Sequence, residues 1–263
     1  MKVLFFGDIV GATAVRHLAE RIPRWRREYE IDLVVANAEN AAVSDPDDIN
    51  RGFGTPARVV ETLFEAGVDV LTGGNHSWDA PDAALVFEHP RVLRPHNVER
   101  SLPGHGTVRL AVGLRHVTVV NLITRSAALP HAIARAPLSA FDELTFEPGD
   151  LILVDFHAER QLEKRALGHA LDGRVAAVIG THTHEPTLLT ERLPKGTLFV
   201  ADAGMNGPSG GVLGMAAEDF YDQLRGGALG AFTLATGPFQ LGAVLLDFSG
   251  RRAEIRRFAP VQV

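Results

Sequence analysis

The chain has 263 residues, of which 46% are hydrophobic and 22% charged, and its formal net charge is −6. This composition is ordinary for a globular protein and allows a sizeable core. Because the chain contains no cysteine, disulfides, thiolate metal sites, iron–sulfur clusters and cysteine nucleophiles are excluded. The acidic balance disfavours the extended positive surface that duplex nucleic acid requires, but it leaves room for a small nucleotide in a compensated pocket.

The apolar run before Asp8 is too short for the core of a signal peptide. No later segment reaches the roughly 18 apolar residues of a membrane span. We therefore expect a cytoplasmic protein with no membrane partner. Its oligomeric state is not readable from the sequence, which leaves a homo-oligomer open.

Short apolar runs recur along the chain, and each ends in a small or polar cluster. In chain order they are VLFF before GD, LVVA before NAEN, VDVL before TGGNH, LILVD before FHAE and VAAVI before GTHTH. Such runs are typical of strands that are buried on both faces, in a sheet covered by helices. Helical spacing predicts helices over residues 12–29, 56–66, 79–87 and 159–171, and residues 107–123 and 242–258 predict two hairpins.

No linker, low-complexity tract or internal repeat divides the chain. Residues 1–263 are therefore predicted to form a single α/β domain, with functional loops at the carboxyl ends of the strands. The loop after the first predicted strand has only Gly7 and Gly11, so it lacks the G-x-G-x-x-G of a dinucleotide site.

The strand ends carry oxygen and imidazole donors. Taken alone, Asp8 can cap a helix, Glu39 can be a solvated loop carboxylate, and Asn40 can be a turn former. A single histidine such as His157 can be a hydrogen-bonded structural residue. Five separate strand ends carry such donors, however, and the ends of parallel strands meet at one edge of a sheet, so a shared site is favoured. The candidate residues are Asp8, Glu39, Asn40, Asn75, His76, His157, His182 and His184.

Two of these clusters are the most informative. In GGNHSWD, the paired glycines at 73 and 74 let the backbone approach another group closely. In THTH, an extended backbone would point His182 and His184 to the same side, because side chains repeat every second residue. The other histidines have no such placement and are interpreted as background; they are His17, His89, His96, His105, His116, His131 and His169.

Several motifs occur in a fixed order, and together they are highly specific. They are GDIVG at 7–11, AEN at 38–40, GGNHSWD at 73–79, DFHAE at 155–159, GTHTH at 180–184, LPKGT at 193–197, DAGMNGP at 202–208 and GVLGM at 211–215. In these motifs the chain resembles the calcineurin-like metallophosphoesterases, and more closely their YmdB-type bacterial branch. The resemblance implies a four-layer α/β/β/α sandwich with two metal ions at the strand ends.

Two departures from the wider superfamily are typical of this branch. The usual D-x-H is here Asp8-Ile9-Val10, and the usual bridging aspartate is Glu39. A third departure is local: Gln161 and Leu162 stand where the resemblance leads us to expect small hydroxyl residues, which affects phosphate recognition if that segment touches substrate. The glycine-rich segment 202–214 either wraps the site or forms a turn.

The resemblance also implies a role for each candidate residue. Asp8, Glu39 and His184 would hold the first metal, with Asn40 close by or ligating. Glu39 would bridge to a second metal, which Asn75, His157 and His182 complete. His76 would be the general acid beside the leaving-group oxygen. Iron or manganese is the implied metal, and the ligand types also suit zinc or magnesium.

The implied activity is hydrolysis of cyclic nucleotides, chiefly 2′,3′-cyclic ones, with 3′,5′-cyclic AMP as a further substrate. Two cations would neutralise the phosphodiester and lower the pKa of a bridging water, so that hydroxide attacks phosphorus while His76 protonates the leaving group. An RNA-processing nuclease is an alternative that the acidic balance disfavours. A regulatory protein that binds metal or nucleotide with little turnover is another, which the presence of His76 disfavours.

Overall fold

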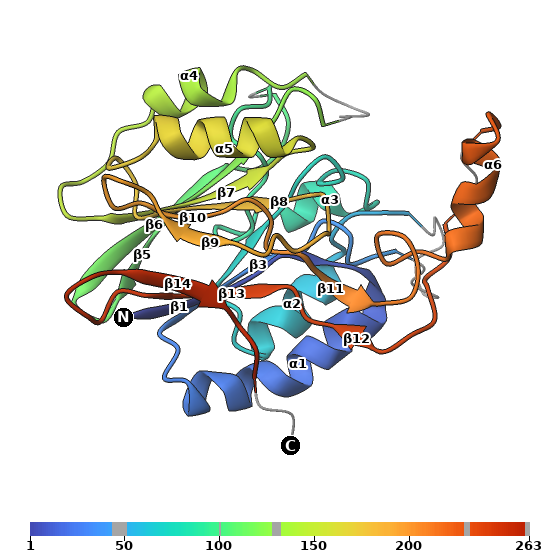
Figure 1. Cartoon of the computed structure of the whole chain (residues 1–263), viewed down its shortest axis with the longest axis horizontal. Helices are drawn as coiled ribbons and strands as arrows, with labels where there is room; N and C mark the ends of the chain where they lie inside the picture. Colours follow the sequence, from blue (N-terminus) through green and yellow to red (C-terminus); the bar gives the residue numbers. More distant parts are fainter. Residues whose placement is uncertain (44–51, 100, 128–132, 229–231, 261–263) are drawn as a thin grey trace.

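The computed structural model describes residues 1–43, 52–99, 101–127, 133–228 and 232–260. Two sheets lie face to face, with α1 and α2 over the outer face of one and α4 and α5 over the outer face of the other (Figure 1). This order of helix, sheet, sheet and helix is the four-layer α/β/β/α sandwich that the family resemblance implied.

The first sheet has the order β14-β13-β1-β3-β4. Its strands are β14 (Glu254–Arg257), β13 (Ala243–Asp247), β1 (Lys2–Phe6), β3 (Leu33–Asn37) and β4 (Val70–Thr72). β1, β3 and β4 run parallel, whereas β13 pairs antiparallel with both β1 and β14. The hairpin predicted over residues 242–258 is therefore confirmed.

The second sheet has the order β5-β6-β7-β8-β10-β9. Its strands are β5 (Thr107–Val112), β6 (Arg115–Ile123), β7 (Leu151–His157), β8 (Ala177–Thr181), β10 (Leu198–Val200) and β9 (Thr190–Arg192). β6, β7, β8 and β10 run parallel, and β5 and β6 form the hairpin predicted over residues 107–123. A small third sheet joins β12 (Phe239–Gln240), β11 (Met205–Pro208) and β2 (Asp8–Ile9).

Strand β1 explains why the apolar runs are continuous. Val3 and Phe5 pack between the two sheets, whereas Leu4 and Phe6 pack under α1 and α2. Strand β7 repeats this division, with Leu153 between the sheets and its neighbours under α4 and α5. A strand whose two faces are both covered needs apolar residues at every position, which is the pattern read from the sequence.

The helices are α1 (Gly11–Glu28), α2 (Ala57–Glu65), α3 (Ala83–Val86), α4 (Pro137–Asp142), α5 (Gln161–Ala170) and α6 (Tyr221–Leu224), with a 3₁₀ helix η1 (Ala217–Phe220). The predictions of α1, α2 and α5 are correct to within two residues. α3 is shorter than the predicted helix over 79–87, and α4 was not predicted. No helix within the described ranges is long and apolar enough to cross a membrane.

Candidate metal centre

The candidate residues lie together at the carboxyl-end edge of the sandwich, but they come from both large sheets rather than from one. Glu39 and Asn40 follow β3, and Asn75 and His76 follow β4, so these four belong to the first sheet. The second sheet supplies the rest except Asp8, which lies in β2: His157 ends β7, and His182 and His184 follow β8.

Glu39 is at the centre of the cluster and is only 1% exposed. Its Oε1 lies 3.2 Å from His157 Nε2 and accepts a hydrogen bond from Asn40 Nδ2 at 3.0 Å. Asn75 Oδ1 lies 2.9 Å from the same His157 nitrogen. One donor atom each from Glu39, His157 and His182 fall within 4.8 Å of one another. Such convergence of carboxylate and imidazole donors suits a metal ion.

A second group of donors adjoins the first. Asp8 Oδ1 lies 3.9 Å from His184 Nε2 and 3.8 Å from His157 Nδ1. Asn40 Nδ2 lies 3.1 Å from His184 Nε2. Asp8 and His184 are both buried. The N-cap of α1 is Val10 and has no side-chain cap hydrogen bond, so Asp8 does not cap that helix.

Two buried oxygens in this second group test whether the residues fit a metal. Within the described part of the chain, Asp8 Oδ1 and Asn40 Oδ1 have no hydrogen-bond partner. A buried polar atom without a partner costs roughly 1–3 kcal/mol. A metal ion bound by Asp8 and Asn40 would supply the partner that each oxygen lacks, so the donor set fits the metal that the sequence predicts.

The surroundings shift the pKa values of four titratable donors in different directions. Burial opposes charge on both Glu39 and His157, but their attraction lowers the pKa of Glu39 and raises the pKa of His157 to about 8. Burial, with the nearby His157, lowers the pKa of His182 to about 2. Because its pKa is this low, His182 is a neutral imidazole at physiological pH. Burial raises the pKa of Asp8, although His184 and His157 oppose that shift.

Gly74 shows how closely the backbone passes the cluster. A Cβ atom at this position would lie 2.1 Å from Glu39 Oε2 and 2.3 Å from His157 Nε2. The paired glycines predicted to allow a close approach therefore do so, and the group approached is the carboxylate–imidazole pair.

The prediction that His182 and His184 lie on an extended backbone and point to one side is wrong. β8 ends at Thr181, and both histidines have left-handed backbones, with φ of 93° and 61°. The side chains diverge as a result: His182 Nε2 reaches Glu159 at 2.8 Å, whereas His184 Nδ1 reaches the carbonyl oxygen of Leu213 at 2.9 Å.

A buried ion pair holds this bend. Asp202 Oδ2 accepts hydrogen bonds from the backbone N–H of Thr183 at 3.2 Å and from its hydroxyl at 2.6 Å. Lys164 Nζ donates to the same carboxylate oxygen at 2.6 Å, and both charged side chains are at most 1% exposed. Thr183 stands between the two histidines, so Asp202 fixes the residue that separates them.

His76 lies at the rim, with a side chain 22% exposed. Its Nδ1 is 2.7 Å from Asp79 Oδ2, and its ring stacks on Phe53 at a centroid distance of 4.0 Å. Its backbone N–H donates to Glu39 Oε2 at 3.2 Å. Asp79 and Phe53 therefore fix both the direction and the plane of the imidazole.

Thr181 and Asp155, which lie behind His157, were not predicted from the sequence. His157 Nδ1 is 3.1 Å from Thr181 Oγ1, which donates to Asp155 Oδ1 at 2.7 Å. Burial raises the pKa of Asp155 to about 7, although its hydrogen bond from Thr72 opposes the shift. The available signal was spacing, because Asp155 and His157 are two residues apart and share one face of β7.

A cavity of about 340 Å³ opens onto these donors. Its described lining residues are Glu39, Asn40, Phe53, Asn75, His76, His182, His184, Leu213, Met215, Phe220 and Phe232. Gln161 and Leu162 are not among them, and the Leu162 side chain is 78% exposed. Leu213 belongs to the glycine-rich segment 202–214, so that segment contributes to the wall.

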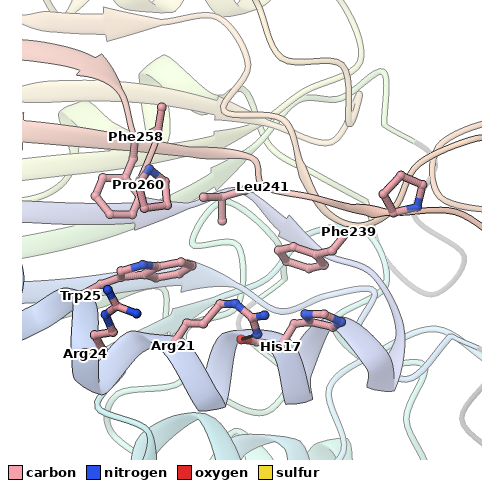
Figure 2. Close-up of a pocket in the computed structure, with 10 residues that line it drawn as sticks. His17, Arg21, Arg24, Trp25, Phe239, Leu241, Phe258 and Pro260 are labelled. Atoms are coloured by element: carbon pink, nitrogen blue, oxygen red, sulfur yellow. Dashed lines mark hydrogen bonds between the residues drawn. The ribbon is translucent and has the colours of Figure 1, made fainter. Parts of the chain in front are cut away.

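A larger cavity of about 630 Å³ lies elsewhere, between α1 and the segments 238–241 and 258–260. Figure 2 shows Arg21 and Trp25 of α1 facing Leu241 and Phe258 across it. Its described lining includes two arginines and no carboxylate, so it does not suit a cation. Of the background histidines, His17 lines this cavity, and His131 lies outside the described residues.

The chain is similar to several known proteins. A family profile described as "YmdB-like protein" matches residues 4–261. The chain is 35% identical over 251 residues to the 2′,3′-cyclic-nucleotide 2′-phosphodiesterase of Bacillus subtilis, covering 94% of this chain and 91% of that protein.

Among solved structures, it is similar to a hypothetical protein from Thermus thermophilus, with 40% identity, a TM-score of 0.86 and 97% of each chain covered. It is also similar to a novel phosphatase from Mycoplasma pneumoniae, with 31% identity, a TM-score of 0.87 and coverage of 98% of this chain and 93% of that one.

The four-layer sandwich, the donor cluster and these relatives define a metallophosphoesterase, a hydrolase of phosphoesters. Within that class, the chain belongs to the YmdB-like family. The resemblance seen in the sequence is therefore confirmed. The class implies divalent metal ions, which the fit of the buried donors supports.

Proposed function

We propose that the chain is a phosphodiesterase that uses two metal ions to hydrolyse 2′,3′-cyclic nucleotides. The observation that carries the proposal is the buried cluster in which Asp8 Oδ1 and Asn40 Oδ1 have no hydrogen-bond partner among the described residues. The name of the Bacillus subtilis relative supports the substrate class, and 3′,5′-cyclic AMP is a second candidate substrate.

Glu39, which contacts both His157 and Asn40, would be the carboxylate that two ions share. The side chains that would hold the ions are Asp8, Glu39, Asn40, Asn75, His157, His182 and His184. His182 faces Glu159 through Nε2, so Nδ1 is the nitrogen left for a ligand. His184 faces the Leu213 carbonyl through Nδ1, so Nε2 is the nitrogen that faces Asn40 and Asp8 in the cluster. Iron or manganese is the proposed metal.

When bound, the ions neutralise phosphate charge and lower the pKa of a water molecule, which makes a nucleophile available near neutral pH. The chain itself supplies the acid. Asp79 holds His76 through Nδ1, which leaves Nε2 to donate a proton to the departing alkoxide. Cleavage of the P–O2′ bond transfers this proton to O2′ and yields the 3′-monophosphate.

The test combines metal analysis with hydrolysis of bis-p-nitrophenyl phosphate and 2′,3′-cyclic AMP. We expect about two metals per chain by the two-metal mechanism, and turnover that a chelator removes and added metal restores. Glu39→Gln and His157→Ala should abolish turnover, whereas His116→Ala, at an exposed position in β6, serves as the control. Retained turnover in metal-free protein contradicts the proposal.

A separate variant tests the acid. His76→Ala should keep both metals but lose rate by about 10²- to 10⁴-fold, the usual contribution of a general acid. The loss should be most severe with poor leaving groups such as a ribose hydroxyl and least with p-nitrophenolate. A His76→Ala protein that has also lost its metal would show that His76 is a ligand and not the acid.

A further inference from the structure

We propose that one wall of the 340 Å³ cavity is the subsite for the nucleobase of the substrate, an inference that rests on the proposed function. This aromatic wall consists of Phe53, Phe220 and Phe232, with the apolar side chains of Leu213 and Met215. A base subsite at the aromatic wall specifies where the base lies and which side chains recognise it. Neither of these follows from the donor cluster.

The cavity has two chemically distinct halves. The donor cluster and His76 form a polar half that suits a phosphate. The aromatic wall forms the other half, and its described residues present only apolar and aromatic side chains to the cavity. A cyclic nucleotide has the same division, because an anionic phosphate and a planar aromatic base lie on either side of one ribose. A volume of about 340 Å³ also falls in the range of roughly 300–1,000 Å³ seen for small-ligand sites.

The rings of the wall form a continuous row that begins at the proposed acid. Phe53 stacks on His76 with an interplanar angle of 18°. Phe232 meets Phe53 edge to face, with centroids 5.7 Å apart, and Phe220 lies 5.3 Å from Phe232. Since His76 would protonate the ribose oxygen, a base joined to that ribose is directed along this row.

Stacking on phenylalanine recognises the π-face that every base has, so it is tolerant of base identity. We therefore expect all four 2′,3′-cyclic nucleotides to be substrates, and purines, with their larger rings, to be preferred.

The test compares two substrates that differ only by the base. They are 2′,3′-cyclic AMP and methyl β-ribofuranoside 2′,3′-cyclic phosphate, which keeps the ribose and the cyclic phosphate. Wild-type protein should prefer the nucleotide.

Phe220→Ala and Phe232→Leu should lower kcat/KM for 2′,3′-cyclic AMP, mainly through KM. Base stacking on one aromatic residue corresponds to a loss of roughly 5- to 150-fold for Phe220→Ala. The base-free substrate should change by no more than about twofold, a margin well below that stacking effect.

Tyr221→Ala is the matched control, because Tyr221 adjoins Phe220, is 45% exposed and is not among the described lining residues. It should leave both substrates unchanged. Phe232→Leu keeps an apolar side chain and serves if Phe220→Ala fails to fold. Adenosine adds a binding measurement: it should inhibit hydrolysis of the base-free substrate, and the wall variants should raise its Ki.

The outcomes separate this inference from the proposed function. Equal losses on both substrates, or no loss on either, overturn the base subsite. Wild-type protein that hydrolyses both substrates with the same kcat/KM also overturns it, while the proposed function stands. Wild-type, metal-loaded protein that hydrolyses neither substrate overturns the proposed function itself.

Discussion

Thr181 connects His157 to a buried carboxylate. The Thr181 hydroxyl donates its proton to Asp155 Oδ1 at 2.7 Å, so toward His157 Nδ1, 3.1 Å away, it can only accept. The Nδ1 proton of His157 is thereby held by Thr181, so Nε2, which faces Glu39 Oε1 and Asn75 Oδ1, is the nitrogen that would give up its proton to bind a metal. Histidines that bind metals are commonly oriented by such a partner, which fixes the tautomer.

Replacing Thr181 by valine keeps the shape of the side chain and removes the hydroxyl. We expect Thr181→Val to weaken metal affinity or activity by about 10- to 100-fold, the usual cost of losing an orienting partner. Thr181→Ser should recover most of the loss, because it restores the hydroxyl without the methyl group. Titration of both variants with metal measures the change in metal affinity. A Thr181→Val protein that binds metal like the wild type would show that the tautomer is set in another way.

At the scale of residues, the sequence revealed those donors that stand outside the apolar runs. GGNH and THTH are visible because polar side chains follow an uninterrupted buried strand. Asp155 and Thr181 lie inside β7 and β8. A polar residue within an apolar run gives no sign in the sequence that it belongs to a site. Only the pairing of the two strands shows that they face each other and His157, and that pairing is a tertiary property.

At the scale of elements, the turn after β4 sets how near the backbone comes to Glu39. Gly74→Ala would bring a methyl group to within 2.1 Å of Glu39 Oε2, so the carboxylate or the turn must move. We expect loss of at least tenfold in metal affinity, since orienting shifts of this kind cost about 10- to 100-fold. Gly250→Ala is the control, because its Cβ would meet only the carbonyl of Arg252 at 3.4 Å. Equal metal affinity in the two variants would contradict this reading.

The bend after β8 depends on the Lys164–Asp202 pair beneath it. Lys164→Met leaves Asp202 buried without its cation, which typically destabilises a protein by about 3–5 kcal/mol. The neighbouring variant Arg165→Met is the control: its ion pair with Glu191 is partly exposed and is worth at most about 1 kcal/mol. Urea unfolding monitored by circular dichroism measures both. Equal stabilities would mean that the buried pair does not hold the loop.

This bend also shows why one prediction failed. The alternation of THTH predicted an extended strand with both histidines on one side, because local spacing was the only information available. The left-handed φ values of His182 and His184 are instead held by contacts of Asp202 with Thr183, which are 19 residues apart. Long-range hydrogen bonds of this kind leave no periodic signal in the sequence.

At the scale of the whole molecule, the candidate site lies at the interface between the two large sheets. Asn37 of β3 and Thr72 of β4 both donate to Asp155 of β7, so one carboxylate bridges the sheets. Burial on both faces predicted a covered sheet, but the division into two sheets came from the family resemblance. A single domain over residues 1–263, a cytoplasmic location and a homo-oligomer all stay predictions.

Because the donors come from both sheets, they converge only in the folded chain, and metal should therefore stabilise the whole fold. A ligand that binds only the folded state adds about 2.7 kcal/mol at a free concentration of 100 Kd. For a chain of this length that corresponds to a rise in Tm of roughly 5–10 °C.

Thermal unfolding of chelator-treated protein with and without Mn²⁺ measures the shift. Glu39→Gln, which removes the charge of the carboxylate that contacts both His157 and Asn40, should reduce the shift in Tm sharply. If the wild type unfolds at the same temperature with and without saturating Mn²⁺, Mn²⁺ does not bind at a site that requires both sheets.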